Sequence, residues 1–149
     1  MQDSSLKNPV IADNLSSIFI QGGAMAKKKI LVMDDDKLVL RSVKQLLERV
    51  GYDVIGVNSF QEALTALPEH SFNLIISDIR MPEEDGISSI TKIRQYYEDR
   101  KQAQVPVIFI TGYASEDAPI DAIKLGAKDY ILKPFDLDEL IKSIEKNVL

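Results

Sequence analysis

The sequence predicts an α/β domain, with a five-stranded parallel sheet that carries helices on both faces. Short apolar runs alternate along the chain with helical patterns, which is typical of successive strand–helix units. Most of these runs lack regular alternation of apolar and polar residues, as expected for strands that are covered on both faces. Five such units fit a doubly wound sheet of order 2-1-3-4-5, with a site crevice between strands one and three.

The first two units have clear ends. A strand is expected over 30–33, followed by a helix from Asp36, its expected N-cap, to Gly51, a residue type favoured at helix C-termini. A second strand over 54–57 precedes a short helix that Ser59 is expected to cap. The apolar face of the first helix comprises Val39, Val43, Leu46, Leu47 and Val50.

The remaining units follow the same pattern. A third strand runs into Asp78, and Gly86 opens the third helix after a turn. A fourth strand begins about Val105, a fourth helix covers roughly 116–125, and a fifth strand covers 130–132. The last helix is expected to bury Leu137, Leu140, Ile141, Ile144 and Val148.

Composition narrows the class of protein. The chain has 149 residues, the usual size of one domain, and its net charge of −5 argues against direct binding of nucleic acid. The absence of cysteine excludes disulfides, thiolate metal sites and a cysteine nucleophile. No apolar run approaches the length needed to cross a bilayer, so we expect a cytoplasmic protein without membrane insertion.

The first 26 residues differ from the rest of the chain. They mix Ser, Asn and Gln with one short apolar patch, and they lack the basic start and long apolar core of a signal peptide. We therefore expect residues 1–26 to be an N-terminal extension or an added leader, and residues 27–149 to form the domain.

Polar residues follow four of the apolar runs directly. They are Asp34 and Asp35, Asp78, Thr111, and Lys133. If the runs are parallel strands of one sheet, these groups gather at its carboxyl edge, where such sheets place their sites. Three carboxylates, a hydroxyl and an amine form a site for a divalent cation and a phosphoryl group. This pattern predicts a protein that is phosphorylated on an aspartate.

Four ordered motifs carry a family resemblance: LVMDDD at 31–36, DIRMPEEDG at 78–86, IFITGYA at 108–114 and DYILKPF at 129–135. From about residue 28 onward, the chain resembles the CheY-like receiver domains of two-component response regulators. A double aspartate alone is a weak signal, but four motifs in order, each at a strand end, are a specific one. The resemblance implies a CheY-like, flavodoxin-like fold.

The resemblance also implies roles for these residues. Asp78 would be the phosphoacceptor, whose carboxylate attacks the phosphorus of a phosphohistidine. Asp35, Asp78 and the backbone carbonyl of Arg80 would coordinate Mg²⁺ (or Mn²⁺), with Asp34 acting through a metal-bound water. Lys133 would offset the negative charge and bind a phosphoryl oxygen. Without metal, we expect mutual repulsion to raise the pKa of at least one carboxyl group.

A switch is implied as well. Thr111 would bond the phosphoryl group while the ring of Tyr130 moves inward, which changes the face formed by helix four, strand five and helix five. The Lys133–Pro134 bond is expected to be cis, as in the family. Arg80 and Tyr113 either border the path of an attacking water, so that self-dephosphorylation is slow and suits a persistent signal or a phosphorelay, or point to solvent and have no effect.

The implied partners are a sensor histidine kinase or a histidine phosphotransfer protein, and a downstream protein. A phosphorylation-dependent dimer is a further option. Such a domain would be no enzyme beyond catalysing its own phosphorylation and dephosphorylation.

Two other classes share part of the pattern. A haloacid-dehalogenase-like phosphatase also carries Asp-x-Asp after an apolar strand, and residues 34–36 fit it. Leu38 and the absence of a cap-sized insertion argue against that class, which would also leave Asp78 without a role. A flavodoxin-like cofactor protein has the same topology, but no Ser/Thr-rich or Gly-rich phosphate loop follows the first strand.

Overall fold

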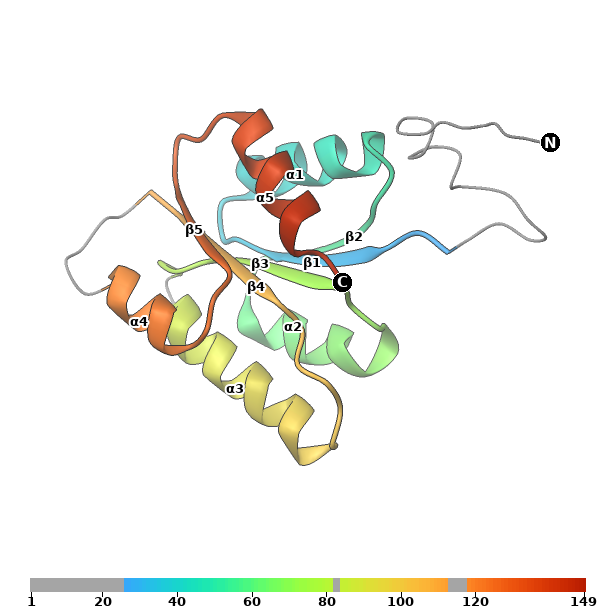
Figure 1. Ribbon diagram of the computed structural model, residues 1–149, viewed down its shortest axis with the longest axis vertical. Coiled ribbons are helices and arrows are strands. Elements are labelled where there is room, and N and C mark those ends of the chain that lie inside the picture. Colours follow the sequence, from blue (N-terminus) through green and yellow to red (C-terminus); the bar gives the residue numbers. More distant parts are fainter. Residues whose placement is uncertain (1–25, 82–83, 113–117) are drawn as a thin grey trace.

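The fold is a parallel sheet between two helical layers (Figure 1). The computed structural model describes residues 26–81, 84–112 and 118–149, with only the backbone for 118–120. Neighbouring strands are parallel in the order β2-β1-β3-β4-β5, which confirms the predicted order. The strands are β1 (Lys29–Met33), β2 (Asp53–Val57), β3 (Leu74–Asp78), β4 (Val107–Thr111) and β5 (Asp129–Leu132).

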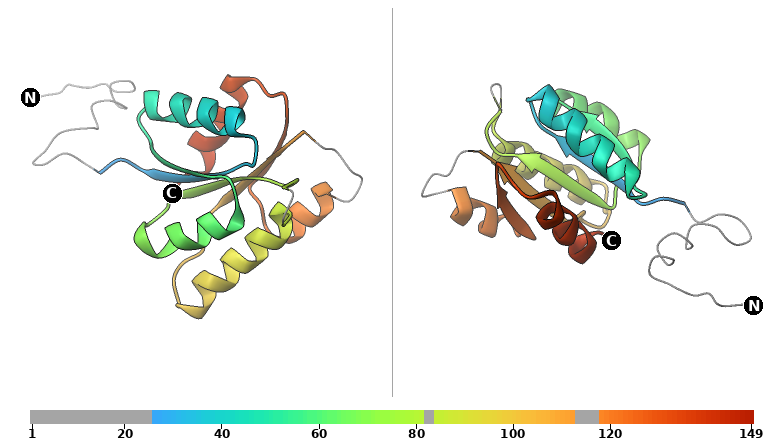
Figure 2. Two further views of the ribbon diagram at one scale, coloured as in Figure 1. Left: turned by 180° about the vertical axis from the view of Figure 1, so that it is seen from behind. Right: turned by 90° about the horizontal axis from the view of Figure 1, so that it is seen from above.

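Helices cover both faces of the sheet. The helices are α1 (Lys37–Arg49), α2 (Phe60–Ala66), the short 3₁₀ helix η3 (Leu67–Glu69), α3 (Gly86–Asp99), α4 (Ala118–Lys124) and α5 (Leu137–Asn147). α1 and α5 lie on one face, whereas α2 and α3 lie on the other, as Figures 1 and 2 show. Within the described residues, no helix is both long enough and apolar enough to cross a membrane.

The sheet separates two apolar clusters. One lies beneath α2 and α3 and includes Leu31, Ile75 and Phe109, and the other lies beneath α1 and α5 and includes Ile30, Ile76 and Ile108. Successive strand residues therefore point into different layers, which explains why the apolar runs are continuous. Each fully buried aliphatic or aromatic side chain contributes roughly 1.5–3 kcal/mol. The strand ends thus project from a rigid frame.

Several helix ends form as the sequence predicts. The carboxylate of Asp36 accepts bonds from two backbone N–H groups in the first turn of α1. Ser59 caps α2 by accepting one bond, from the backbone N–H of Glu62. Asp85 caps α3, where the sequence had indicated only a turn and a helix start. Gly51 follows α1 with a φ angle of 108°, a conformation that glycine adopts without the steric cost of a Cβ.

Other details differ from the expectation. The predicted burial of Leu137 is wrong: this side chain is 50% exposed, because it starts α5 and lies outside the apolar cluster that Leu140 and Ile144 enter. Val50 is 48% exposed, because it follows the last residue of α1. β4 begins at Val107, two residues later than expected. The expected start of the fourth helix at Glu116 lies outside the described residues.

Candidate functional site

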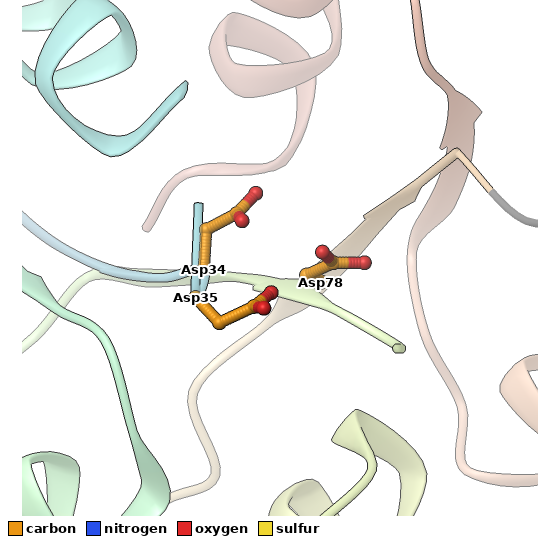
Figure 3. Close-up of side chains that lie close together, drawn as sticks. All are labelled: Asp34, Asp35 and Asp78. Atoms are coloured by element: carbon orange, nitrogen blue, oxygen red, sulfur yellow. The ribbon is translucent and has the colours of Figure 1, made fainter. Parts of the chain in front are cut away.

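Three carboxylates meet at the carboxyl edge of the sheet. β1 and β3 pair in a register that sets Met33 opposite Ser77, so the residues that follow each position are neighbours. Asp34 and Asp35 come directly after β1, and Asp78 ends β3. One carboxylate oxygen from each aspartate lies within 4.8 Å of the others, and Figure 3 shows the three side chains converging. The predicted gathering of these groups is present in the structure.

Asp34 is the most enclosed of the three. Its side chain is fully buried, Asp78 is 5% exposed, and Asp35 is exposed. Burial is the largest influence on Asp34 and raises its pKa, whereas bonds from Lys133 and from the backbone N–H of Asp36 act to lower it. The charge of Asp78 raises it further, as a smaller contribution. The expected pKa rise is present, but its main cause is burial rather than repulsion.

Lys133 contacts two of the carboxylates. Its Nζ lies 2.7 Å from Asp34 Oδ2 and 3.1 Å from Asp78 Oδ2. Burial acts to lower the pKa of Lys133, but the bonds to both carboxylates outweigh it and the pKa is raised overall. The backbone N–H of Lys133 donates to the carbonyl of Thr111, so β4 helps to place the lysine. The Lys133–Pro134 peptide bond is cis, as predicted.

The segment after Asp78 is held close to it. The backbone N–H of Arg80 donates to Asp78 Oδ1 at 3.2 Å, and Gly86 N–H donates to the carbonyl of Ile79 at 2.7 Å. A Cβ at Gly86 would lie only 2.1 Å from the carbonyl oxygen of Asp78, so any side chain there would displace the backbone. From the sequence, Gly86 was predicted only to start a helix. The buried hydroxyl of Ser77 donates to the carbonyl of Asp78, and no sequence pattern predicted this contact.

The proposed switch residues lie on neighbouring strands. Thr111 ends β4 and is fully buried. Tyr130 lies in β5 opposite Phe109 of β4, and its ring packs against the apolar cluster beneath α2 and α3. The buried hydroxyl of Tyr130 has no hydrogen-bond partner among the described residues, and burial raises its pKa. Of the two predicted dephosphorylation modulators, Arg80 is exposed and Tyr113 lies outside the described residues.

The donor set suits a hard divalent cation. Carboxylate oxygens are the ligands that Mg²⁺ and Mn²⁺ prefer, and Mg²⁺ usually binds one or two carboxylates together with waters and phosphate oxygens. Asp34, Asp35 and Asp78 provide such a group, and the exposed Asp35 leaves one side open to solvent. A lysine beside them can bind an anionic oxygen once one arrives.

Comparison with known families decides which class of protein has this site. A model of the response regulator receiver domain matches residues 30–145. The chain belongs to this family. The chain is similar to the transcriptional regulatory protein ZraR of Escherichia coli, with 38% identity over 117 residues. These residues make up 78% of this chain and 25% of ZraR. The chain thus spans about a quarter of that relative's length.

Solved structures agree with this assignment. The chemotaxis protein CheY4 of Vibrio cholerae superimposes with a TM-score of 0.75 at 26% identity, over 83% of the receiver and 100% of that chain. The response regulator protein TrrA of Thermotoga maritima, solved in complex with Mg²⁺–BeF, superimposes with a TM-score of 0.69 at 28% identity, over 81% and 99% of the two chains. None of these comparisons supports the haloacid-dehalogenase alternative.

Proposed function

We propose that this receiver domain, residues 27–149, accepts a phosphoryl group on Asp78 from the phosphohistidine of a sensor histidine kinase or of a histidine phosphotransfer protein. The observation that carries the proposal is the position of the Asp78 carboxylate, close to two other carboxylates and to Lys133. Residues 1–26 would lie outside the domain.

The transfer exchanges one bond to phosphorus for another. A carboxylate oxygen of Asp78 attacks the phosphorus, the bond between phosphorus and the imidazole nitrogen breaks, and its electron pair stays on the imidazole. The product is an acyl phosphate on Asp78. Lys133, 3.1 Å from the acceptor carboxylate, is placed to bind an oxygen of the incoming group. The N–H of Arg80 holds the other carboxylate oxygen and limits rotation of the acceptor.

Asp35, Asp78 and the backbone carbonyl of Arg80 would hold Mg²⁺, with Asp34 bound through a water. When bound, the ion would neutralise the carboxylates and the phosphoryl oxygens, which otherwise repel each other. The protein contributes a cluster that is already assembled, and it keeps Asp34 in place through the bonds from Lys133 and from the N–H of Asp36. The Mg²⁺–BeF complex of TrrA supports this assignment by family likeness.

The output would be a change in packing near Tyr130. Thr111 would bond the phosphoryl group, and the shift of β4 would alter the space that the ring of Tyr130 occupies. The unpartnered buried hydroxyl of Tyr130 supports a two-state role, because such a group costs about 1–3 kcal/mol and an alternative position can recover a bond. The exposed Ile123 on α4 and Leu132 on β5 offer apolar contacts for a downstream partner or a second copy.

Arg80 and Tyr113 would shield the acyl phosphate from the attacking water and make self-dephosphorylation slow. The bond from the backbone N–H of Arg80 to Asp78 Oδ1 supports its part in this proposal, because it places Arg80 next to the acceptor carboxylate. The rate of phosphoryl loss should rise in Arg80→Asn and Tyr113→Ala. If neither change speeds the decay, the shielding is wrong while the acceptor assignment stands.

A phosphorylation assay tests the central proposal. With Mg²⁺ and acetyl phosphate, the intact mass of the wild-type protein should increase by one phosphoryl group. Asp78→Asn should show no increase, and Asp35→Ala should show little, because it removes a metal ligand. Equal labelling of Asp78→Asn and wild type would overturn the assignment of the acceptor.

A further inference from the structure

A row of side chains connects the segment after Asp78 with two helices. Glu84 Oε2 accepts bonds from Ser88 Oγ at 2.9 Å and from Lys92 Nζ at 2.9 Å. Ser88 and Lys92 are four residues apart and lie on the same side of α3, and Glu84, two residues before the helix begins, contacts both. The Lys92 ammonium also lies 5.3 Å from the centroid of the Phe60 ring, at the start of α2. Lys92, in α3, therefore contacts both Phe60 in α2 and Glu84 in the chain that leads into α3.

This row borders the candidate metal site. Glu84 and Phe60 line a hollow of about 440 Å³ that is also lined by Asp35, the exposed carboxylate of the site. Met81, in the segment between Asp78 and α3, lines the same hollow. The bond from Lys92, followed by that from Ser88, lowers the pKa of Glu84, which agrees with a charge-assisted contact. The contacts of Lys92 are thus made beside a proposed ligand of Mg²⁺.

We propose that Lys92 is a positioning residue, which holds Glu84 and Phe60 so that Asp35 and the main chain at Ile79 and Arg80 keep the arrangement that Mg²⁺ binding needs. This inference rests on the proposed function. The far end of the segment is tied by the bond from Gly86 N–H to Ile79, whereas Glu84 is tied to the helix surface through Lys92 and Ser88. Gly86 lies two residues after Glu84, and its bonded partner Ile79 directly precedes Arg80. Loss of the lysine contact would weaken this link and loosen the main chain at Arg80, whose carbonyl we propose as a ligand.

The direction in which the Kd for Mg²⁺ changes when Lys92 is replaced distinguishes a positioning role from a purely electrostatic one. Lys92→Met keeps the apolar stem but removes the charge, the bond to Glu84 and the cation–π contact. Removing a positive charge near an acidic site should by itself strengthen the binding of a cation. Positioning predicts the opposite, a weaker site. We expect the Kd for Mg²⁺ to rise about three-fold, in the range that surface ion pairs reach.

Calorimetric titration of the full chain with Mg²⁺ measures this effect. Lys92→Arg should keep a Kd close to that of the wild type, because a guanidinium can make both contacts. Lys44→Met is the matched control: it breaks an ion pair with Glu48 on the surface of α1 and should leave the Kd unchanged. Without metal, the amides of Arg80 and Gly86 should exchange hydrogen faster in Lys92→Met than in the wild type.

The outcomes separate this inference from the proposed function. A Kd in Lys92→Met that is unchanged or lower than in the wild type overturns the inference and leaves the proposed function standing. Unchanged amide exchange in this variant also overturns it. If the wild-type protein itself binds no Mg²⁺, the proposed function fails.

Discussion

The ion pairs of Lys133 and the ion pair of Lys44 join the same kinds of groups in opposite surroundings. Lys133 lies 2.7 and 3.1 Å from the oxygens of Asp34 and Asp78, and the exposed fractions of these side chains are 19%, 0% and 6%. Lys44 lies 2.5 Å from Glu48, one helical turn away, and the two side chains are 41% and 44% exposed. The distances are similar, but the access of water is not.

The access of water sets how much each ion pair contributes to stability. An exposed pair one turn apart on a helix contributes about 0.3–0.5 kcal/mol, because water already solvates both charges well. A buried cluster carries a desolvation cost that its partners must offset. At the carboxyl edge of the sheet, one lysine faces two buried or nearly buried carboxylates. The fold therefore retains an excess of negative charge at the place where a cation and a phosphoryl group would bind.

The largest effect on stability is expected from Lys133→Met. It should lower the free energy of unfolding by about 3 kcal/mol, because it leaves Asp34 and Asp78 without their cation. Lys44→Met should lower it by less than about 0.5 kcal/mol. Urea denaturation at neutral pH without metal measures both values. Equal losses in the two variants would mean that burial does not separate the two pairs.

Mg²⁺ should supply the charge that the buried cluster lacks. At one hundred times its Kd, it should stabilise the wild-type protein by about 2.7 kcal/mol. Thermal unfolding with and without Mg²⁺, and with excess chelator as a control, measures this gain. Lys44→Met should show the full gain and Asp35→Ala almost none. A full gain in Asp35→Ala would place the ion elsewhere.

Asp34→Asn should stabilise the metal-free protein by about 1 kcal/mol at neutral pH, since it removes a buried charge and leaves Lys133 paired with Asp78. Burial raises the pKa of Asp34 in the folded state above its usual value of 3.8. The contribution of protonated Asp34 to the stability of the fold is therefore complete below pH 3.8 and is lost as pH rises through the folded-state pKa.

The gain in the free energy of unfolding that Asp34→Asn brings should therefore be smallest below pH 3.8 and should grow as pH rises. Unfolding curves across this range measure the trend for both proteins. A loss of stability of the same size at every pH would show instead that the bond from Lys133 to Asp34 outweighs the cost of burial.

Thr111→Ala should lower the free energy of unfolding by about 1 kcal/mol, because a buried hydroxyl is lost with little change in packing. Its effect on signalling should be larger. Addition of beryllofluoride with Mg²⁺ should shift the NMR signals near Tyr130 in the wild type and much less in Thr111→Ala. Shifts of wild-type size in the variant would mean that another group connects the site with Tyr130.

Local patterns were enough to predict most of the frame. Asp36 and Ser59 cap helices as expected, since a short polar side chain before an apolar run can accept bonds from the free N–H groups of the first turn. The burial of Leu137 was not predictable, because helical spacing sets the direction of a side chain but not where the neighbouring layer ends. Val50 is exposed for the same kind of reason.

The amino-acid sequence was sufficient for the succession of strands and helices along the chain and for the residues at the carboxyl ends of the strands, because period, capping and strand-end chemistry are local properties. The differences between these residues arise from the tertiary structure. Asp34 and Asp36 are two positions apart, yet one is a fully buried carboxylate with a raised pKa and the other is an exposed cap. The contact of Lys92 with Phe60, 32 positions away in the chain, likewise depends on the packing of α3 beside α2. Burial and long-range contact come from the packing of distant segments, which no local pattern records.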